Sequence, residues 1–198
     1  ERPPALPTWA RDLFAEGLAS LDTVFFDIPW IMRGGCRCQW CRDSKNMGLT
    51  NDHIVRNALR TLVHDLRHDF PSVKFAVNAS APGLNRDLWT GGHIRNLVGI
   101  FDEYVTEWNP YRWGQSASVI AQAIRSTGKE VSNGKITHAF TATTRHGDLL
   151  SQDQLQSLFE VILSNGASPW LSVHFGQKYL EQIYSAYLSG REKTHKVG

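Results

Sequence analysis

The sequence predicts an α/β fold in which short strands alternate with helices. Five runs rich in β-forming residues start near residues 23, 73, 103, 135 and 168, and a segment with helical periodicity follows each of them. The last three runs begin about thirty residues apart, which is the length of a strand–helix unit that supports parallel strands. No Asn-Gly turn joins two of the runs directly, so no antiparallel hairpin is predicted.

The composition is that of one globular domain. The 198 residues are 41% hydrophobic, which is enough to form a single core. The formal net charge is only +2, so a nucleic-acid-binding surface is not expected. No apolar run approaches the roughly 18 to 20 residues of a membrane span, so no membrane partner is expected either. The seven Trp, five Tyr and nine Phe are many for this length, and ring-shaped ligands such as sugars stack on aromatic side chains.

In the first half of the chain, a long amphipathic helix separates two predicted strands. The first strand, 23–28, ends before Pro29, and a loop that holds all three cysteines follows it. The helix 51–68 has its apolar residues on one face, and Thr50 or Asn51 is expected to cap it. The remaining elements of this half are helices at 8–18 and 92–100 and a strand at 73–78.

The second half repeats the strand–helix pattern three times. Gly128 is predicted to end the helix 113–127, because glycine commonly terminates helices. Ser151 and Gln154 form a predicted capping box at the start of the helix 151–164. The remaining elements are strands at 103–108, 135–142 and 168–174 and a last helix at 177–188.

Polar residues gather where the predicted strands end, which favours a barrel over an open parallel sheet. In a (β/α)8 barrel the carboxyl ends of all strands converge on one mouth, where active sites are built. No Gly-x-Gly-x-x-Gly and no phosphate loop follows a strand, so a nucleotide-binding, doubly wound sheet loses its best support. The strand-end residues are Asp27, Asn78, Glu107, Trp108, residues 141–144 and His174.

The length indicates part of a barrel. A complete barrel takes roughly 250 residues and eight strands, whereas five strands are predicted here. We therefore expect residues 1–198 to form a single partial TIM-barrel domain, about strands four to eight, with the N-terminal strands missing.

The three cysteines, Cys36, Cys38 and Cys41, lie within six residues. Three cysteines so closely spaced make a poor disulfide framework. A disulfide between cysteines two positions apart in the chain is strained, and one of the three thiols is always left over. A metal site or a local redox element is the better interpretation, and the cellular compartment is left open.

The segment around these cysteines resembles barrel glycoside hydrolases. The run Asp22-Thr-Val-Phe-Phe-Asp-Ile-Pro-Trp30, followed by Cys36-Arg-Cys38-Gln-Trp-Cys41, is similar to hypothetical glycosyl hydrolase families and α-L-fucosidase-like proteins. Family 42 β-galactosidases have a similar cysteine triplet about nine residues after the carboxylate that ends strand four, and Cys36 is nine residues after Asp27. The match covers roughly residues 22–42, and beyond it only the order of elements agrees.

For the cysteines, the resemblance implies a structural zinc ion bound by Cys36, Cys38 and Cys41. The fourth ligand is open, and His53 is the nearest imidazole downstream. The alternatives are thiols packed in a loop, one disulfide with a spare thiol, and a redox pair at Cys38-x-x-Cys41. The redox pair is disfavoured because no helix is predicted to begin at the motif. No organic cofactor is expected.

Glycoside hydrolysis needs two carboxyl groups, and three are candidates. Asp27 ends a hydrophobic strand, where a carboxylate is either functional or held by a neighbour such as Arg33. Strand alternation puts Glu107 on the same face as Val105, near the mouth. Asp148 lies on the loop after the next strand, and negative charge before a helix is favourable in any case.

We therefore predict a glycoside hydrolase, retaining if its two carboxyl groups lie close together. The resemblance implies that Asp27 is the nucleophile, and Glu107 would be the acid/base. The residues expected to bind the carbohydrate are Trp30, Asn78, Trp108, Arg145, His146 and His174. The rival hypothesis is a non-catalytic carbohydrate-binding or structural barrel fragment that assembles as a homo-oligomer through its open sheet edges.

Overall fold

The computed structural model describes Gly17 and residues 21–27, 38–78, 94–113, 116–132, 134–172 and 177–195. The chain divides into two compact units, Glu1–Tyr104 and Val105–Gly198. The boundary between the units falls inside the third of five strands.

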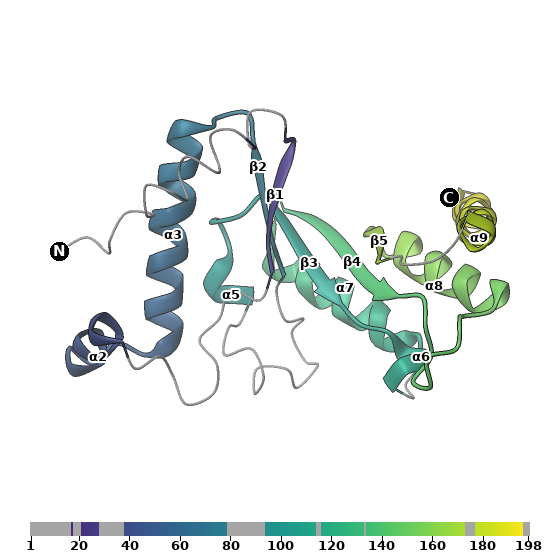
Figure 1. Cartoon of the computed structure of the whole chain (residues 1–198), viewed down its shortest axis with the longest axis horizontal. Coiled ribbons are helices and arrows are strands. Elements are labelled where there is room, and N and C mark those ends of the chain that lie inside the picture. The colour runs from purple at the N-terminus through teal and green to yellow at the C-terminus, as the bar shows by residue number, and fades with distance from the viewer. Residues whose placement is uncertain are drawn as a thin grey trace. The chain divides into compact units, whose positions relative to one another are not determined.

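The five strands run parallel in one sheet, in the order β1-β2-β3-β4-β5 (Figure 1). Each strand thus neighbours the next one in the chain, and every connection between them contains a helix. A doubly wound sheet reverses direction at a switch point, whereas a barrel adds its strands in sequence. The predicted α/β fold with parallel strands and barrel order is therefore confirmed.

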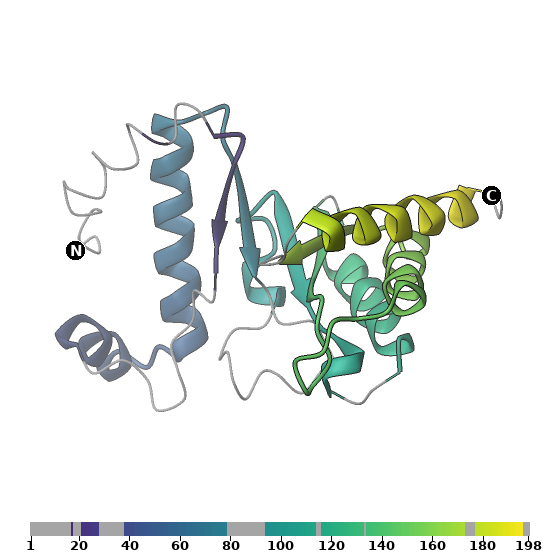
Figure 2. The ribbon, with the colours of Figure 1, turned by 45° about the vertical axis from the view of Figure 1, so that its right-hand side comes forward.

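The first unit contains a long helix beside two strands. α3 (Asn51–Asp69) runs alongside β1 (Thr23–Phe26) and β2 (Lys74–Asn78), as Figures 1 and 2 show. It begins as predicted, because the Thr50 side chain accepts a hydrogen bond from the His53 backbone N–H. Its buried face consists of Ile54, Val55, Leu59, Val63 and Leu66. The register pairs Thr23 with Lys74 and continues to Phe26 and Val77.

Asp102 fixes the amino end of β2 in this unit. Its Oδ2 accepts a 2.8 Å hydrogen bond from the Phe75 backbone N–H, and its Oδ1 accepts one of 2.8 Å from Arg67. The backbone N–H of Asp102 in turn donates to the Phe75 carbonyl. Arg67 of α3 also lies over the Phe75 ring, so one aspartate ties the helix to the strand.

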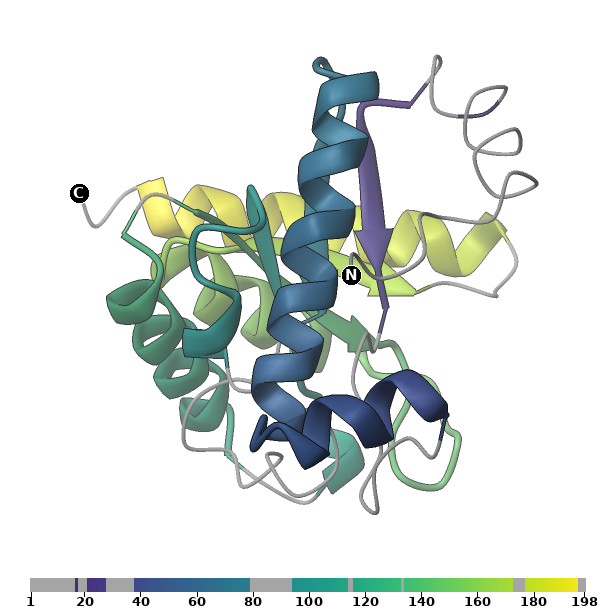
Figure 3. The same cartoon turned by 90° about the vertical axis from the view of Figure 1, so that its left-hand side faces the viewer.

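The remaining elements of the first unit are short. α2 (Gln39–Asn46) lies across the N-terminal end of α3, as Figure 3 shows. α5 (Ile94–Leu97) is one turn long and precedes the start of β3 (Glu103–Glu107).

The second unit packs three longer helices with the later strands. Its elements are the end of β3, α6 (Pro110–Trp113), α7 (Ser118–Glu130), β4 (Lys135–Thr141), α8 (Gln152–Ser164), β5 (Ser168–Ser172) and α9 (Gln177–His195). The predicted capping box of α8 is confirmed, with Ser151 and Gln154 each bonding the other's backbone N–H. α9 approaches α8 closely at Gly190, where a Cβ atom would lie 3.1 Å from that of Phe159.

Several predicted boundaries differ from the structure. α7 continues through Gly128 to Glu130, because this glycine keeps a helical backbone instead of the left-handed conformation with which glycine ends helices. The last helix extends to His195 instead of stopping at residue 188. The cysteine segment was predicted as a loop, yet α2 begins directly after Cys38. The predicted helix 8–18 lies outside the described residues except for Gly17.

None of the helices in the described ranges is long and apolar enough to cross a membrane.

Candidate active site

Two predicted site residues meet at the carboxyl ends of β1 and β2. Asp27 follows β1 directly, and Asn78 is the last residue of β2. The register pairs Phe26 with Val77, so the two residues that follow are neighbours. The Asn78 Nδ2 donates a 2.9 Å hydrogen bond to Asp27 Oδ1, which orients the carboxylate at the strand end. Asp27 is exposed, so water and a ligand can both reach it.

Glu107 ends β3 in the second unit and is exposed. Along β3 the Tyr104 hydroxyl donates to the Leu97 carbonyl and accepts from the Gly99 N–H, so Tyr104 points toward the turn after α5. Strand alternation therefore puts Val105 and Glu107 on the opposite face, away from that turn. Tyr104, Val105 and Thr106 are all buried, so both faces of β3 are covered up to Glu107.

A buried histidine on β4 supports the end of β3. His138 is fully buried; its Nδ1 lies 2.8 Å from Thr106 Oγ1 and its Nε2 lies 3.0 Å from the Trp108 carbonyl. Burial lowers the pKa of His138 to about 4, so the ring is neutral at pH 7. A neutral ring satisfies both contacts, because Nε2–H donates to the carbonyl and Nδ1 accepts from the threonine hydroxyl.

Asn109 joins the end of β3 to the loop after β4. Its Nδ2 donates hydrogen bonds to the Thr141 carbonyl at 2.6 Å and the Thr143 carbonyl at 2.8 Å. Its Oδ1 accepts from the Tyr111 backbone N–H at 3.0 Å. Since Asn109 is only 3% exposed, these bonds replace its contacts with water and fix the backbone next to Glu107.

The loop after β4 presents three predicted site residues to solvent. Arg145, His146 and Asp148 are all exposed. An antiparallel bridge between Thr143 and Leu149 closes the base of this loop. The tip turns at Gly147, whose φ of +87° is readily adopted only by glycine. The three side chains are thus carried on a closed turn.

Tyr179 of α9 anchors the base of the same loop. Its hydroxyl lies 3.2 Å from the Ala142 carbonyl and 3.1 Å from the Leu150 carbonyl. Ala142 and Leu150 are themselves joined by a 2.9 Å backbone hydrogen bond, so the hydroxyl fastens both sides of the loop.

The remaining predicted residues fall into two groups. Trp30, His174 and Cys36 lie outside the described residues. Trp108 is only 8% exposed, so little of its ring is left to stack on a ligand.

Sequence reasoning missed the supporting residues Thr106, His138 and Asn109. Asn109 alone carried a signal, as a polar residue directly after a predicted strand end.

The cysteine segment differs from the predicted loop. Cys38 is the N-cap residue of α2, and its Sγ accepts a 3.5 Å hydrogen bond from the Cys41 backbone N–H. Cys38 is exposed and Cys41 is buried. Within the described ranges no group of three potential metal ligands comes together. Because Cys36 lies outside those ranges, the three-cysteine zinc site stays a prediction.

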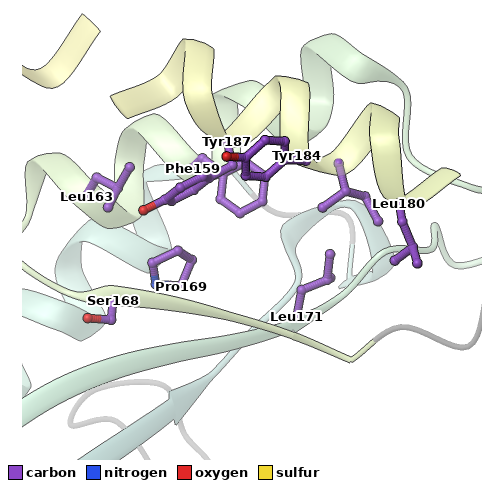
Figure 4. Close-up of a pocket in the computed structure, with 9 residues that line it drawn as sticks. Phe159, Leu163, Ser168, Pro169, Leu171, Leu180, Tyr184 and Tyr187 are labelled. Atoms are coloured by element: carbon purple, nitrogen blue, oxygen red, sulfur yellow. The ribbon is translucent and has the colours of Figure 1, made fainter. Parts of the chain in front are cut away.

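A groove of about 510 Å³ lies between α8, β5 and α9 (Figure 4). None of the predicted site residues lines it, and it offers no acidic group for catalysis. Its lining is almost entirely apolar: Phe159, Leu163, Ser168, Pro169, Leu171, Leu180, Ile183, Tyr184 and Tyr187.

Comparison with known proteins identifies the fold. No protein-family model matches the chain, and no curated protein matches it. Among solved structures, the chain is similar to the crystal structure of bee venom hyaluronidase, with a TM-score of 0.54 and 11% sequence identity. The similarity covers 94% of this chain and 74% of that one. The chain has a (β/α)-barrel type of fold. At 11% identity the likeness concerns the fold alone, so any activity must be argued from the residues.

Proposed function

We propose that the chain is a glycoside hydrolase whose catalytic carboxylates lie at the carboxyl ends of its strands. The observation that carries the proposal is the hydrogen bond from Asn78 to Asp27. It orients an exposed carboxylate at the end of the sheet where barrel enzymes build their active sites. The similar solved structure is by its name a hyaluronidase, an enzyme that acts on a polysaccharide, which supports a carbohydrate substrate.

The proposed reaction is retaining and has two steps. Asp27 attacks the anomeric carbon while Glu107 protonates the departing glycosidic oxygen, which leaves a covalent glycosyl-aspartate. A water molecule then gives a proton to Glu107 and attacks the same carbon, which releases the sugar and restores both carboxyl groups. This mechanism requires the two carboxyl groups to lie about 5 to 5.5 Å apart.

Two features support Glu107 as the acid/base. It is exposed at a strand end, and the bonds of Asn109 and His138 hold the backbone beside it. Asp148 is the second candidate for this role, because it lies on the loop that Asn109 ties to the same strand end. Arg145 and His146 on that loop are available to bond sugar hydroxyls or a carboxylated sugar.

The zinc ion that the resemblance implies is kept as part of the proposal. Cys38 and Cys41 fit such an ion, because sulfurs one helical turn apart can bind one metal together. With Cys36 they would hold a structural zinc ion.

The experiment compares matched substitutions at the two ends of the same strands. Asp27→Asn and Glu107→Gln are assayed on a panel of aryl glycosides. The controls are Asp22→Asn, directly before β1, and Glu103→Gln, at the start of β3. Loss of an acid, base or nucleophile is expected to lower kcat by at least about a hundredfold. The control variants are expected to keep activity within about threefold, because they lie at the opposite strand ends. Circular dichroism checks that each variant is folded.

A second measurement separates the two roles. Azide added to Asp27→Ala should replace the missing nucleophile and yield a glycosyl azide of the opposite anomeric configuration. Azide added to Glu107→Ala should yield the retained configuration. Full activity in Asp27→Asn would contradict the proposal.

The rival hypothesis gives a different result. A carbohydrate-binding or structural barrel would turn over no glycoside on the panel, yet would bind sugars or associate through its sheet edges. Calorimetric titration and mass measurement in solution would detect these two behaviours.

A further inference from the structure

The last two turns of α3 carry a repeated dipeptide. The helix ends in the run His64-Asp-Leu-Arg-His-Asp69, which contains His-Asp twice, four residues apart. Residues four apart on a helix lie on the same side of it, with Cβ atoms about 5 to 6 Å apart. Two histidines at this spacing are a common ligand pair in zinc proteins, as in the His-Glu-x-x-His helix of metalloproteases.

Both imidazoles are open to solvent, so a dissolved ion can reach them. The His64 side chain is 81% exposed and the His68 side chain is 84% exposed. They lie on the side of α3 that faces away from its buried residues. No apolar contact therefore has to be broken for the two rings to turn toward one ion.

Each ring is bonded to the carboxylate that follows it in the chain. His68 Nδ1 lies 3.1 Å from Asp69 Oδ1, and His64 Nδ1 lies 3.4 Å from Asp65 Oδ1. A carboxylate only accepts hydrogen bonds, so Nδ1 carries the proton in the neutral rings and Nε2 keeps its lone pair. Metal-binding histidines share this arrangement, in which one ring nitrogen donates to a carboxylate and the other ligates the ion.

The charges around the pair permit a cation. Arg67 lies between the two histidines in the sequence, but its guanidinium is paired with Asp102 at 2.8 Å. Asp65 and Asp69 place two carboxylates directly beside the rings. They offset part of the positive charge that an ion would bring.

We propose that His64 and His68 together bind one late first-row divalent metal ion, such as Ni²⁺, Cu²⁺ or Zn²⁺, through their Nε2 atoms. Imidazole is a ligand that these ions share, whereas Mg²⁺ and Ca²⁺ prefer oxygen. The two rings fill two coordination positions and water fills the others. The site is therefore open, unlike a structural zinc site with four protein ligands.

This site is separate from the zinc ion proposed for the cysteines. His64 lies eleven residues further along α3 than His53, which is a rise of about 16 Å. α2, which carries Cys41, contacts the other end of the helix (Figure 3). The site also stands independently of the proposed glycosidase activity, because its test needs no substrate.

The experiment labels the full chain with diethyl pyrocarbonate, which acylates accessible imidazole nitrogens, with and without Ni²⁺. Trypsin then places His64 and His68 on separate peptides, 61–67 and 68–74. Labelling of both peptides is expected to slow about tenfold once the Ni²⁺ concentration is about ten times Kd, because the ligating nitrogen is occupied. Mg²⁺ in place of Ni²⁺ is expected to have no effect.

The same digest contains a matched control. His53 is exposed on the same helix and lies on peptide 46–56, and the sequence has no other histidine one turn away from it. Its labelling is expected to stay the same with and without Ni²⁺. Protection of His53 alone would place the ion near the cysteines and would overturn the proposal.

Two variants test whether the rings act as a pair. In His68→Gln, His64 is expected to lose its protection at the same Ni²⁺ concentration, and His64→Gln should do the same to His68. A single imidazole is expected to bind at least about tenfold more weakly than two linked ones. Circular dichroism checks that the variants are folded, and labelling of the unmodified chain decides the main question without them.

Three further outcomes would contradict a shared ion. The first is equal labelling of both peptides with and without Ni²⁺. The second is protection of only one of the two peptides. The third is protection of His64 that persists unchanged in His68→Gln, because each histidine would then bind its own ion.

Discussion

Asn78 and Asp27 lie 51 residues apart in the chain, yet the Asn78 side chain donates a 2.9 Å hydrogen bond to the Asp27 carboxylate. The parallel register of β1 and β2 produces this contact, because it pairs Phe26 with Val77 and brings the next residues together. An amide donor satisfies one carboxylate oxygen and limits rotation of the group. Asn78 therefore acts as a positioning residue for Asp27 in the proposed reaction.

Replacing Asn78 tests this relationship. Asn78→Ala removes the hydrogen bond, and kcat on a responsive aryl glycoside is expected to fall about tenfold while KM changes less. Stability is expected to change by less than about 1 kcal/mol, because Asp27 is exposed and water can replace the amide. Asn57→Ala, on the exposed face of α3, is the control and should change neither quantity. Unchanged kcat in Asn78→Ala would mean that the bond does not position the carboxylate.

His138 makes stability depend on pH. Its pKa is about 4 in the folded chain, against an ordinary value of 6.5, because burial disfavours the charged ring. Between pH 6.5 and 4 the unfolded chain therefore binds a proton that the folded chain does not. The free energy of unfolding falls across this window as the pH falls, by about 3 kcal/mol from this residue.

Urea denaturation at pH 7 and pH 4.5 measures this effect. The difference between the two pH values should be smaller in His138→Gln than in the unmodified chain. The exposed His64, changed to Gln, is the control and should leave the difference unaltered. An equal pH dependence in His138→Gln would contradict a buried neutral ring.

Asn109 should be hard to replace. Asn109→Ala leaves the Tyr111 N–H and two carbonyl groups without their side-chain partner, so we expect a loss of about 1 to 3 kcal/mol. Asn109→Asp should cost more at neutral pH, because a carboxylate oxygen would then face the Thr141 and Thr143 carbonyl oxygens. Chemical denaturation compares the two variants, and Asn57→Asp on α3 is the control. A more stable Asp variant would mean that the amide does not donate to these carbonyls.

Asp102 should contribute more to stability than its ion-pair partner. Asp102→Ala leaves the Phe75 backbone N–H without its acceptor, and Phe75 is fully buried, so a loss of about 1 to 3 kcal/mol is expected. Arg67→Ala should cost less than about 1 kcal/mol, because the Arg67–Asp102 pair is more than one-third exposed. Urea denaturation of both variants checks the order, and the reverse order would contradict this explanation.

The sequence predicted the alternation of strands and helices because apolar periodicity is a local property. The apolar face of α3 and the capping box of α8 both follow from residues a few positions apart. The start of α2 was missed because its N-cap is a cysteine, which is not among the usual capping residues. The boundary at Gly128 was wrong because glycine ends a helix where it adopts a left-handed conformation, and Gly128 keeps a helical backbone.

Local sequence patterns were therefore enough to predict the fold class and to place Asp27, Asn78 and Glu107 at strand ends. The hydrogen bond from Asn78 to Asp27, and the support that His138 and Asn109 give to the backbone around Glu107, became visible only in the folded chain. Periodicity and capping act over a few residues, whereas these hydrogen bonds join residues 30 to 51 positions apart. Their partners are fixed only when neighbouring strands take their register.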